Sequence, residues 1–284
     1  MISLNSGQYT YRIRGDIASV KDELTRLYPH SLNHDFAIAD FDIKIQQTSL
    51  LRTLLRPQVT LNIEGHKPFN PIHPAKLLPS IEWAMNWCVS AYDHTKLLIH
   101  CSVAVKNGKA ILFPAKSGSG KSTLSAYLGL NGWHLYSDEM AIINLDTGYV
   151  EPIFRPASLK NESIEIIKPF VQADEHYMSR TTRGTHKGDI AHVRTMSKDV
   201  FDKLEPSKIA AVLFLDFDKN KRFNVYEIDK SIGLAKIITN AFNYSVIGEA
   251  AFNILVSIIN KATILEVSYG EMADMKELIG ELVI

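Results

Sequence analysis

Cysteine is scarce in this sequence. The 284 residues include only Cys88 and Cys101, which form neither a CxxC pattern nor a spacing typical of metal ligands. The two thiols therefore do not indicate a cysteine-based metal centre, and we expect both to be reduced, as thiols are in a cytoplasm. Internal repeats and low-complexity tracts are also lacking, which excludes repeat architectures.

Net charge and long apolar runs are lacking as well. The 31 lysines and arginines balance 31 aspartates and glutamates, so the sequence carries no electrostatic signal for a nucleic acid or a membrane surface. The longest apolar stretches, such as Ile209–Leu215, are far too short to cross a bilayer, and the N-terminus has no apolar signal region. We expect a cytoplasmic protein with no nucleic-acid partner and no membrane span. The 46% hydrophobic content is ample for a core.

The most informative segment present is Ile111–Thr123, which reads ILFPAKSGSGKST. It predicts an apolar strand, a Gly/Ser-rich loop and the start of a helix. Gly118 and Gly120 allow the backbone to wrap closely around an anion, and the helix N-terminus directs unpaired N–H groups at the same place. Lys121 adds a cation for the β- and γ-phosphates, and the Ser122 hydroxyl is a ligand for Mg²⁺. The expected nucleotide-binding residues are Ser117, Gly118, Ser119, Gly120, Lys121, Ser122 and Thr123.

This loop departs from the Walker A pattern at one position. Ala115 stands where the pattern has its first glycine, a change that is tolerated where the backbone does not need a positive φ. The alternative interpretation is a Gly/Ser turn before a surface lysine. The apolar strand expected at Ala110–Phe113 and the helix expected from Ser122 to Asn131 favour phosphate binding, and therefore ATP or GTP chemistry.

The first part of the chain predicts a separate, smaller α+β lobe over residues 1–95. Strands are expected at Tyr9–Ile13, Phe36–Ile45 and Gln58–Ile63. Apolar residues recur at helical spacing from Pro74 to Tyr92. The two tryptophans of that helix either line a site or pack the lobe against the rest; they are Trp83 and Trp87.

The second part, residues 96–284, predicts an α/β domain with a mixed sheet. A strand is expected at Leu97–Val105, and Lys106–Lys109 is a strong hairpin turn, so the strand before the phosphate loop should pair antiparallel with its predecessor. The near-continuous apolar run Ile209–Phe217 predicts a central strand. Further expected elements are a C-terminal glycine cap at Gly132, a strand at Trp133–Tyr136, a hairpin of Met140–Asn144 with Tyr149–Phe154, and a helix at Asn161–Ile167.

An acidic pair and a histidine flank the phosphate loop. Asp138 and Glu139 begin seventeen residues after Lys121, an interval that fits one helix and one returning strand. A phosphate-bound Mg²⁺ needs a hard oxygen ligand from such a place, and a hydroxyl nucleophile needs a carboxylate to accept its proton. His100 precedes Ala115 by fifteen residues and would bond Asp138 and tune its basicity. The alternatives are a solvated acidic turn and an ordinary core or surface histidine.

Three later segments leave their roles open. Arg155 and Lys160 either reach the acceptor or belong to a solvated loop. Tyr177–Gly188 is expected to be a mobile basic loop that closes over ATP, with Lys187 as the cation that it supplies, or else an ordinary exposed connection. For Asn243 and Tyr244, a structural capping role is favoured over contact with an acceptor.

These spacings resemble the C-terminal catalytic domain of HPr kinase/phosphorylase, in which a histidine precedes the phosphate loop and an acidic pair follows its helix. A closer resemblance is to the HPr-kinase-related kinases of the A type, a bacterial group of predicted kinases, and it spans nearly the whole chain. The segments that carry it are Arg56–Gln58, Trp83–Cys88, Pro114–Thr123, Ser137–Glu139, Arg155–Asn161, Thr185–Gly188 with Ala191 and His192, and Ala241–Val246.

The resemblance implies a fold like the HPr kinase and PEP carboxykinase P-loop core. It implies that Asp138 is the general base, that Glu139 and Ser122 hold Mg²⁺, that Lys121 stabilises the transferring phosphoryl group, and that His100 belongs to the site. The chain has Asp-Glu where HPr kinase has two aspartates, which leaves the metal assignment weaker. Phosphorylase activity and an HPr substrate are not implied. HPr kinases assemble into rings, so a homo-oligomer stays open for this chain.

The sequence thus predicts a Mg²⁺-ATP-dependent kinase that phosphorylates a hydroxyl, serine-like, on an unidentified protein, peptide or small molecule. Two other classes stay open. One is a nucleotide-binding sensor or assembly module that transfers nothing, and the other is a simple NTPase.

Overall fold

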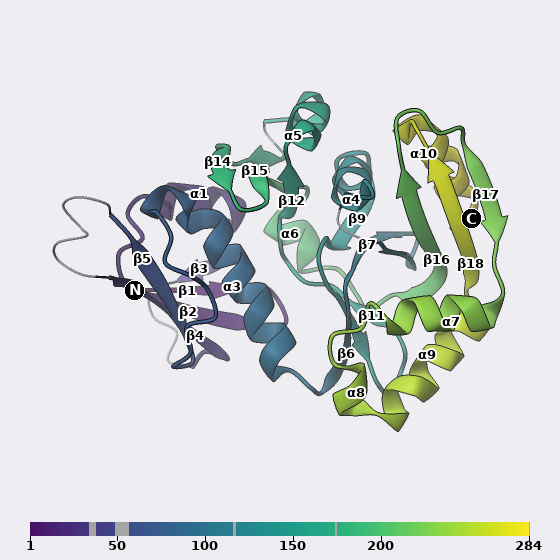
Figure 1. Cartoon of the computed structure of the whole chain (residues 1–284), viewed down its shortest axis with the longest axis horizontal. Helices are drawn as coiled ribbons and strands as arrows, with labels where there is room; N and C mark the ends of the chain where they lie inside the picture. Colours follow the sequence, from purple (N-terminus) through teal and green to yellow (C-terminus); the bar gives the residue numbers. More distant parts are fainter. Residues whose placement is uncertain (34–37, 49–56, 116–117, 174, 284) are drawn as a thin grey trace. The chain divides into compact units, whose positions relative to one another are not determined.

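The computed structural model describes the whole chain except residues 34–37, 49–56, 116–117, 174 and 284. The described chain forms two compact units (Figure 1). One joins Met1–Tyr92 with Phe154–Asp202, and the other joins Asp93–Ile153 with Lys203–Ile284. The first boundary lies near the predicted division after residue 95, but residues 154–202 pack with the N-terminal stretch. The predicted division into functional domains stays a prediction.

The α/β class with mixed sheets is confirmed. The five-stranded sheet of the first unit combines antiparallel pairs with a parallel pair between Tyr11–Arg14 and Phe41–Lys44. The six-stranded sheet of the second unit is mixed as well, because one of its strands has an antiparallel neighbour on one side and a parallel neighbour on the other.

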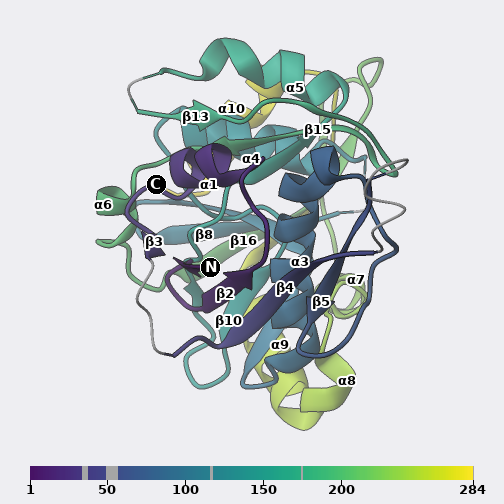
Figure 2. The same ribbon diagram turned by 90° about the vertical axis from the view of Figure 1, so that its left-hand side faces the viewer.

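The first unit contains two sheets, and helix α3 contacts a strand of each, β5 and β15. Strand order is β3-β1-β2-β4-β5 in the larger sheet and β12-β15-β13 in the smaller one, with β14 paired to β15. Strands β4 and β5 of the larger sheet are seen beside helix α3 in Figure 2. The elements are β1 Ile2–Asn5, β2 Thr10–Arg14, α1 Lys21–Leu27, β3 Leu32–Asn33, β4 Phe41–Gln47, β5 Val59–Ile63, η1 Pro74–Lys76, α3 Leu77–Tyr92, β12 Ala157–Lys160, α5 Glu162–Ile167, η2 Lys168–Phe170, β13 Tyr177–Met178, β14 Thr182–Thr185, β15 Gly188–Arg194 and α6 Lys198–Phe201.

The second unit is built on a six-stranded sheet of order β17-β18-β16-β8-β7-β9, with a smaller sheet of order β11-β10-β6. Its elements are β6 Lys96–Ile99, β7 Cys101–Lys106, β8 Lys109–Pro114, α4 Lys121–Leu130, β9 His134–Ser137, β10 Ala141–Asn144, β11 Val150–Glu151, β16 Lys208–Phe217, β17 Asn224–Glu227, α7 Lys230–Ile238, α8 Tyr244–Ile247, α9 Glu249–Lys261, β18 Thr263–Tyr269 and α10 Met272–Glu281.

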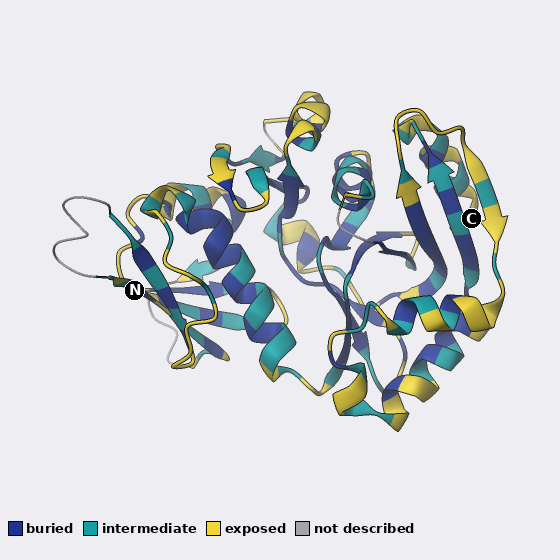
Figure 3. Ribbon diagram, in the orientation of Figure 1, coloured by how far each residue is buried: buried dark blue, intermediate teal, exposed yellow. Residues whose placement is uncertain are grey.

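The six-stranded sheet is buried on both faces, because alternate residues of its strands enter two different cores. Ile111 and Leu213 pack with apolar residues of α4 and α10. Leu112 and Val212, their chain neighbours, pack instead with α7, α9 and strands of the small sheet. Strand β16 is therefore central, as its continuous apolar run predicted, and its buried middle is visible in Figure 3.

Most expected elements are present, with ends that differ by a few residues. Helix α4 begins at Lys121, and Gly132 has the positive φ of 82° that suits a helix C-terminus. The hairpin turn before β8 is confirmed, and β7 and β8 pair antiparallel. The strand expected at 36–45 begins at Phe41, and residues 36–37 lie outside the described residues, as does Arg56.

Four expectations were wrong, three about elements and one about a side chain. Leu97–Val105 is not one strand: β6 joins the small sheet, β7 joins the large one, and His100 lies between them. The strand expected at Tyr149–Phe154 contains only β11. Tyr177–Gly188 is not a loop, because β13 and β14 pair with β15. Arg155 is neither solvated nor directed at an acceptor, because its side chain is buried in an ion pair with Glu82 at 2.6 Å.

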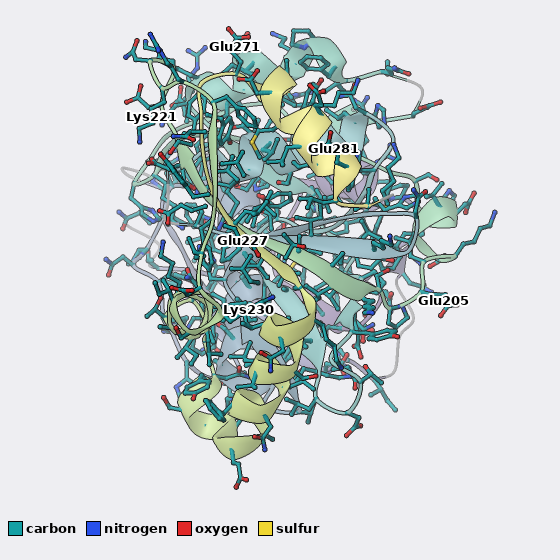
Figure 4. All side chains as sticks on the ribbon, turned by 90° about the vertical axis from the view of Figure 1, so that its right-hand side faces the viewer. Glu205, Lys221, Glu227, Lys230, Glu271 and Glu281 are labelled. Atoms are coloured by element: carbon teal, nitrogen blue, oxygen red, sulfur yellow. The ribbon has the colours of Figure 1, made fainter. Side chains whose placement is uncertain are left out.

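The charged surface of the second unit mixes both signs. Six labelled side chains project from its ribbon in Figure 4, namely Glu205, Lys221, Glu227, Lys230, Glu271 and Glu281. Within the described part of the chain, no helix has the length and apolar character needed to cross a bilayer.

Candidate active site

Five strand ends of the second unit meet at one edge of the large sheet. Strands β8, β16 and β18 are parallel, so their C-terminal ends lie together. Strand β7 is antiparallel to β8 and places Cys101 opposite Pro114, while β9 returns with Ser137 opposite Val103. The Gly/Ser-rich loop after β8 therefore begins at the same edge where β7 begins and β9 ends. Helix α4 follows the loop and packs beside β7 and β9 (Figure 1).

Gly120 sits tightly at the N-terminus of α4. It has φ 81°, and a Cβ built on it would lie 2.6 Å from the Tyr269 hydroxyl and 3.0 Å from Cβ of Phe217. Both residues are the last of their strands, β18 and β16. A glycine is thus required here for two reasons, the left-handed backbone and the close approach of the neighbouring strand ends.

Lys121 and His100 form the central contact of the site. The Lys121 ammonium is buried at 7% exposure, and its Nζ lies 3.1 Å from Nε2 of His100. The other ring nitrogen, Nδ1, lies 2.9 Å from the backbone carbonyl of Glu139. A carbonyl only accepts, so Nδ1 carries the proton and Nε2 accepts from the ammonium. The hydrogen-bond partner of this buried cation is therefore a neutral imidazole.

The surroundings keep His100 neutral. Burial is the main cause that lowers its pKa from the ordinary 6.5, and the charge of Lys121 acts in the same direction. The negative charges of Glu139 and Asp138 oppose this, to a smaller extent. A neutral imidazole can orient Lys121 without cancelling its charge, so the cation stays available to an anion that enters the loop.

Asp138 is the buried end of this network, with 2% exposure. Its Oδ1 accepts hydrogen bonds from the hydroxyls of Ser102 at 2.9 Å and Ser125 at 3.0 Å, and Ser102 also bonds its backbone carbonyl at 2.7 Å. The expected bond between His100 and the Asp138 carboxylate is not made, because both ring nitrogens are engaged elsewhere. The two hydroxyls fix Oδ1 and so orient the carboxylate.

The oxygen donors expected for Mg²⁺ fit that ion in chemical type. Ser122 is the second residue of α4, Glu139 follows Asp138, and both are half-buried. No cluster of three or more histidine, cysteine or carboxylate ligands occurs among the described residues. Mg²⁺ at phosphate sites uses one or two protein ligands together with phosphate oxygens and water, so a hydroxyl and a carboxylate are an adequate donor set.

The loop also fits a polyphosphate. Helix α4 begins after Gly120, an N-cap residue that supplies no side-chain hydrogen bond to the first N–H groups of the helix. Within the described part of the chain, the buried Ser119 hydroxyl oxygen has no hydrogen-bond partner. A bound anion can accept hydrogen bonds both from the first N–H groups of a helix and from a loop hydroxyl. Ser117 lies outside the described residues.

Lys187 lies in the other compact unit, at the turn between β14 and β15. Its Nζ stands 5.0 Å from the centre of the Trp83 ring, and the neighbouring His186 contacts the same ring at 4.6 Å. The turn is closed by the Thr185 hydroxyl, which donates to the carbonyl of Gly188 at 2.7 Å. Its expected role toward the transferred phosphate stays a prediction.

Sequence reasoning missed several residues of the site. Ser125 lies one helical turn after Lys121 and is a polar residue on a buried helix face, which is a usable signal. Ser102 lies two positions after His100 among apolar neighbours. Tyr269 carries no motif that points to the loop. The segment around Phe242 belongs to Ala241–Val246, which the resemblance singles out without a role for Phe242. Only the pairing of distant strands brings them to it.

Comparisons with known proteins add no family to these observations. A scan against protein-family models gave no match, and a search of curated proteins gave none either. The resemblance to HPr-kinase-related kinases therefore stays a prediction, and the chemistry must be argued from the site.

Proposed function

We propose that the chain is a Mg²⁺-ATP-dependent kinase with an HPr-kinase-like P-loop core, which phosphorylates a serine-like hydroxyl. The observation that carries the proposal is Lys121, a buried ammonium whose hydrogen-bond partner is the neutral His100. A buried cation is costly unless an anion compensates it. The backbone N–H groups of the Gly-rich loop and of the first turn of α4 are donors that would hold such an anion. The phosphates of a nucleotide would suit these donors and the Lys121 ammonium.

Each residue of the site would have a separate role in phosphoryl transfer. The loop amides and Lys121 would hold the phosphates and stabilise charge on the transferring group. Ser122 and Glu139 would hold Mg²⁺, which when bound neutralises negative charge on the phosphate oxygens. His100 acts as a positioning residue, since it holds the Lys121 ammonium through Nε2 and is itself held by Glu139.

Asp138 would serve as the general base. The acceptor oxygen forms a bond to the γ-phosphorus while the bond from that phosphorus to the bridging oxygen breaks. ADP would leave with the electron pair, and the acceptor proton would pass to the Asp138 carboxylate. Ser102 and Ser125 hold the carboxylate in place through Oδ1. Positioned acid–base groups contribute about 10²–10⁴-fold to rate.

One observation favours a second candidate, a nucleotide-binding module without phosphoryl transfer. Asp138 is 2% exposed, and two hydroxyls already bond its Oδ1, which also suits a purely structural carboxylate. Such a module would use Lys121 and the loop in the same way and would not use Asp138 in chemistry.

The experiment that separates them combines γ-labelled ATP, Mg²⁺ and fractionated cell lysate with calorimetric binding of Mg²⁺-ADP. The variants are Lys121→Ala, Asp138→Asn and the control Asp146→Asn, an exposed aspartate in the turn after β10. For a kinase, Asp138→Asn should lose about 10²-fold or more of the labelling and keep nucleotide affinity within a few-fold. Lys121→Ala should lose nucleotide binding, and Asp146→Asn should behave like the natural protein.

Two results would contradict the kinase proposal. Nucleotide binding that depends on Lys121, without any labelled acceptor in any fraction, would support the module. Release of phosphate at full rate in the absence of lysate would indicate a simple NTPase.

A further inference from the structure

Strand β17 is the last strand of the six-stranded sheet (Figure 1). Within the described part of the chain it pairs with β18 alone, antiparallel, with Tyr226 opposite Glu266. In the same register the Ile228 N–H donates to the carbonyl of Ile264 at 3.2 Å. Even-numbered residues of β17 therefore direct their backbone groups at β18, and odd-numbered residues such as Val225 direct theirs away from the sheet.

The two edges of this sheet differ in how they are covered. At the opposite edge the Ile153 N–H donates to the carbonyl of Tyr136 at 3.0 Å, and the last three residues of β9 are buried. At β17 the side chains face water, since Tyr226 is 57% exposed and Phe223, just before the strand, is 42% exposed. An open edge of this kind offers backbone donors and acceptors to another strand.

Charge changes sign along this open edge. Lys219, Lys221 and Arg222 precede the strand, Glu227 and Asp229 end it, and all five are exposed. Figure 4 labels Lys221 and Glu227 at the two ends of β17. Charges of one sign protect an edge by repelling a second copy, but charges that change sign attract one in the antiparallel direction. The charge pattern of β17 is thus complementary to itself.

A two-fold register centred on Asn224 satisfies the backbone and the charges together. It would place Phe223 of one copy opposite Val225 of the other, and both are odd-numbered residues whose backbone groups point outward. It would also bring Lys221 of one copy opposite Glu227 of the other. Because Val225 packs with the core beneath α10, Phe223 would extend the same apolar face.

The side chains on the other face of the strand fit the same register. Arg222 of one copy would lie opposite Tyr226 of the other, where a guanidinium meets an aromatic ring. In the single copy Lys221 pairs with Asp216, but their side chains are 38% and 55% exposed. An exposed pair contributes little to stability, so it competes only weakly with a contact between copies.

We propose that β17 is a dimer interface, at which a second copy of this chain pairs antiparallel, edge to edge, about a two-fold axis at Asn224. The two six-stranded sheets become one continuous sheet. Such a contact uses the same strand of both copies and closes at two subunits. The strand is short and its charges are exposed, so the dimer is weak and dissociates as salt is raised. This inference does not depend on the proposed kinase function.

Sedimentation equilibrium at low salt, over a wide range of protein concentration, measures the dimer dissociation constant. Lys221→Glu and Glu227→Lys should each raise this constant about tenfold or more, because like charges then meet across the two-fold axis. The double variant Lys221→Glu with Glu227→Lys should restore the dimer, because the pair is only reversed. Glu281→Lys, which changes an exposed charge on α10, is the control and should dimerise like the natural protein.

Hydrogen exchange locates the contact independently of the variants. The amides of Phe223 and Val225 should exchange several-fold more slowly at concentrations that favour the dimer. Circular dichroism and urea unfolding show that each variant is folded. A natural protein that stays monomeric at every concentration overturns the inference, as does an assembly larger than a dimer. A dimer that both single variants preserve, or that leaves these amides unprotected, overturns the assignment to β17.

Discussion

The role of His100 depends on its neighbours and cannot be inferred from its residue type alone. Its carbonyl-bound Nδ1 and its Lys121-bound Nε2 determine one tautomer and a neutral ring. Arg155 is the opposite case, since a side chain expected in a loop is buried at 8% exposure against Glu82. In both cases the partner sets the role of the side chain.

The lowered pKa of His100 predicts a pH effect on stability. Below its ordinary pKa of 6.5 the unfolded chain takes up a proton that the folded site resists, so the free energy of unfolding falls as pH drops below about 6.5. The loss should level off below the folded pKa. Burial lowers the pKa of His134 and His176 too, which adds in the same direction.

The measurement is urea unfolding at several pH values between 5 and 7.5. His100→Gln should flatten the pH dependence relative to the natural protein. The exposed His94 offers a control, and His94→Gln should leave the slope unchanged. A slope that is equal in all three proteins would contradict the assignment of this effect to His100.

Gly120 predicts a second effect at the residue scale. Gly120→Ala should weaken Mg²⁺-ADP binding by tenfold or more, because its Cβ would meet the Tyr269 hydroxyl and Phe217 and displace the loop. Gly132→Ala is the matched control: φ is 82° there, but nothing lies within 4 Å of the place that an added methyl group would take. It should cost about 1–2 kcal/mol of stability from the left-handed backbone alone. Calorimetry and urea unfolding check both, and unchanged affinity in Gly120→Ala would contradict the role of the tight loop.

At the scale of elements, the site is made by strand ends and not by any one strand. The antiparallel β7 brings His100 to the edge where β8 releases the loop, and β9 brings Asp138 to the same edge. The break between β6 and β7 matters, because it lets one stretch of chain serve two sheets with His100 at the junction. The segment at Phe242 enters by pairing with the end of β6.

The anchoring of that segment by Asn243 predicts a large loss of stability on its removal. Asn243→Ala would leave the Leu98 N–H and two carbonyls without their partner, at an expected cost of about 2–4 kcal/mol. The exposed Asn224, which bonds Tyr226 at 2.6 Å, is the control, and Asn224→Ala should change stability by less than about 0.5 kcal/mol. Urea unfolding measures both. Equal values for the two variants would show that Asn243 does not anchor the segment.

At the scale of the whole molecule, each compact unit is assembled from two separate stretches of chain. In the first unit the buried pair of Glu82 and Arg155 ties helix α3 to the beginning of the second stretch. The Tyr28 hydroxyl donates to Glu82 at 2.8 Å, and Asn86 accepts from Arg155 at 2.8 Å. Removing one partner leaves the other charge buried without compensation.

Arg155→Met should therefore destabilise the first unit by about 3–5 kcal/mol. The double variant Glu82→Met with Arg155→Met should cost less than the sum of the two single changes, since no lone charge remains. Trp83 and Trp87 both lie in this unit, so their fluorescence in a Trp133→Phe background reports its unfolding. As a control, Lys168→Met breaks the exposed pair with Glu165 in the same unit and should change stability by about 0–1 kcal/mol. Strict additivity in the double variant would contradict the buried-pair account.

The amino-acid sequence by itself determined the local features of this protein. Periodicity and turn residues sufficed for the α/β class, for the hairpin before β8, for α4 and for the central β16, because these depend on neighbours along the chain. The Gly/Ser-rich loop before α4 and its spacing to Asp138 were likewise visible in the sequence, since they are short-range patterns.

Only the tertiary structure decided which residues meet. No local sequence pattern predicts that Leu97–Val105 divides between two sheets or that residues 154–202 pack with the N-terminal stretch. The contact between Phe242 and His100 is likewise not predicted by any local pattern. Strand order and register depend on the burial of apolar side chains that are distant in sequence and on the pairing of the remaining strand edges. The free energies of burial and pairing are summed over the whole folded chain. The motif is therefore visible in the sequence, whereas its partners are chosen by the fold.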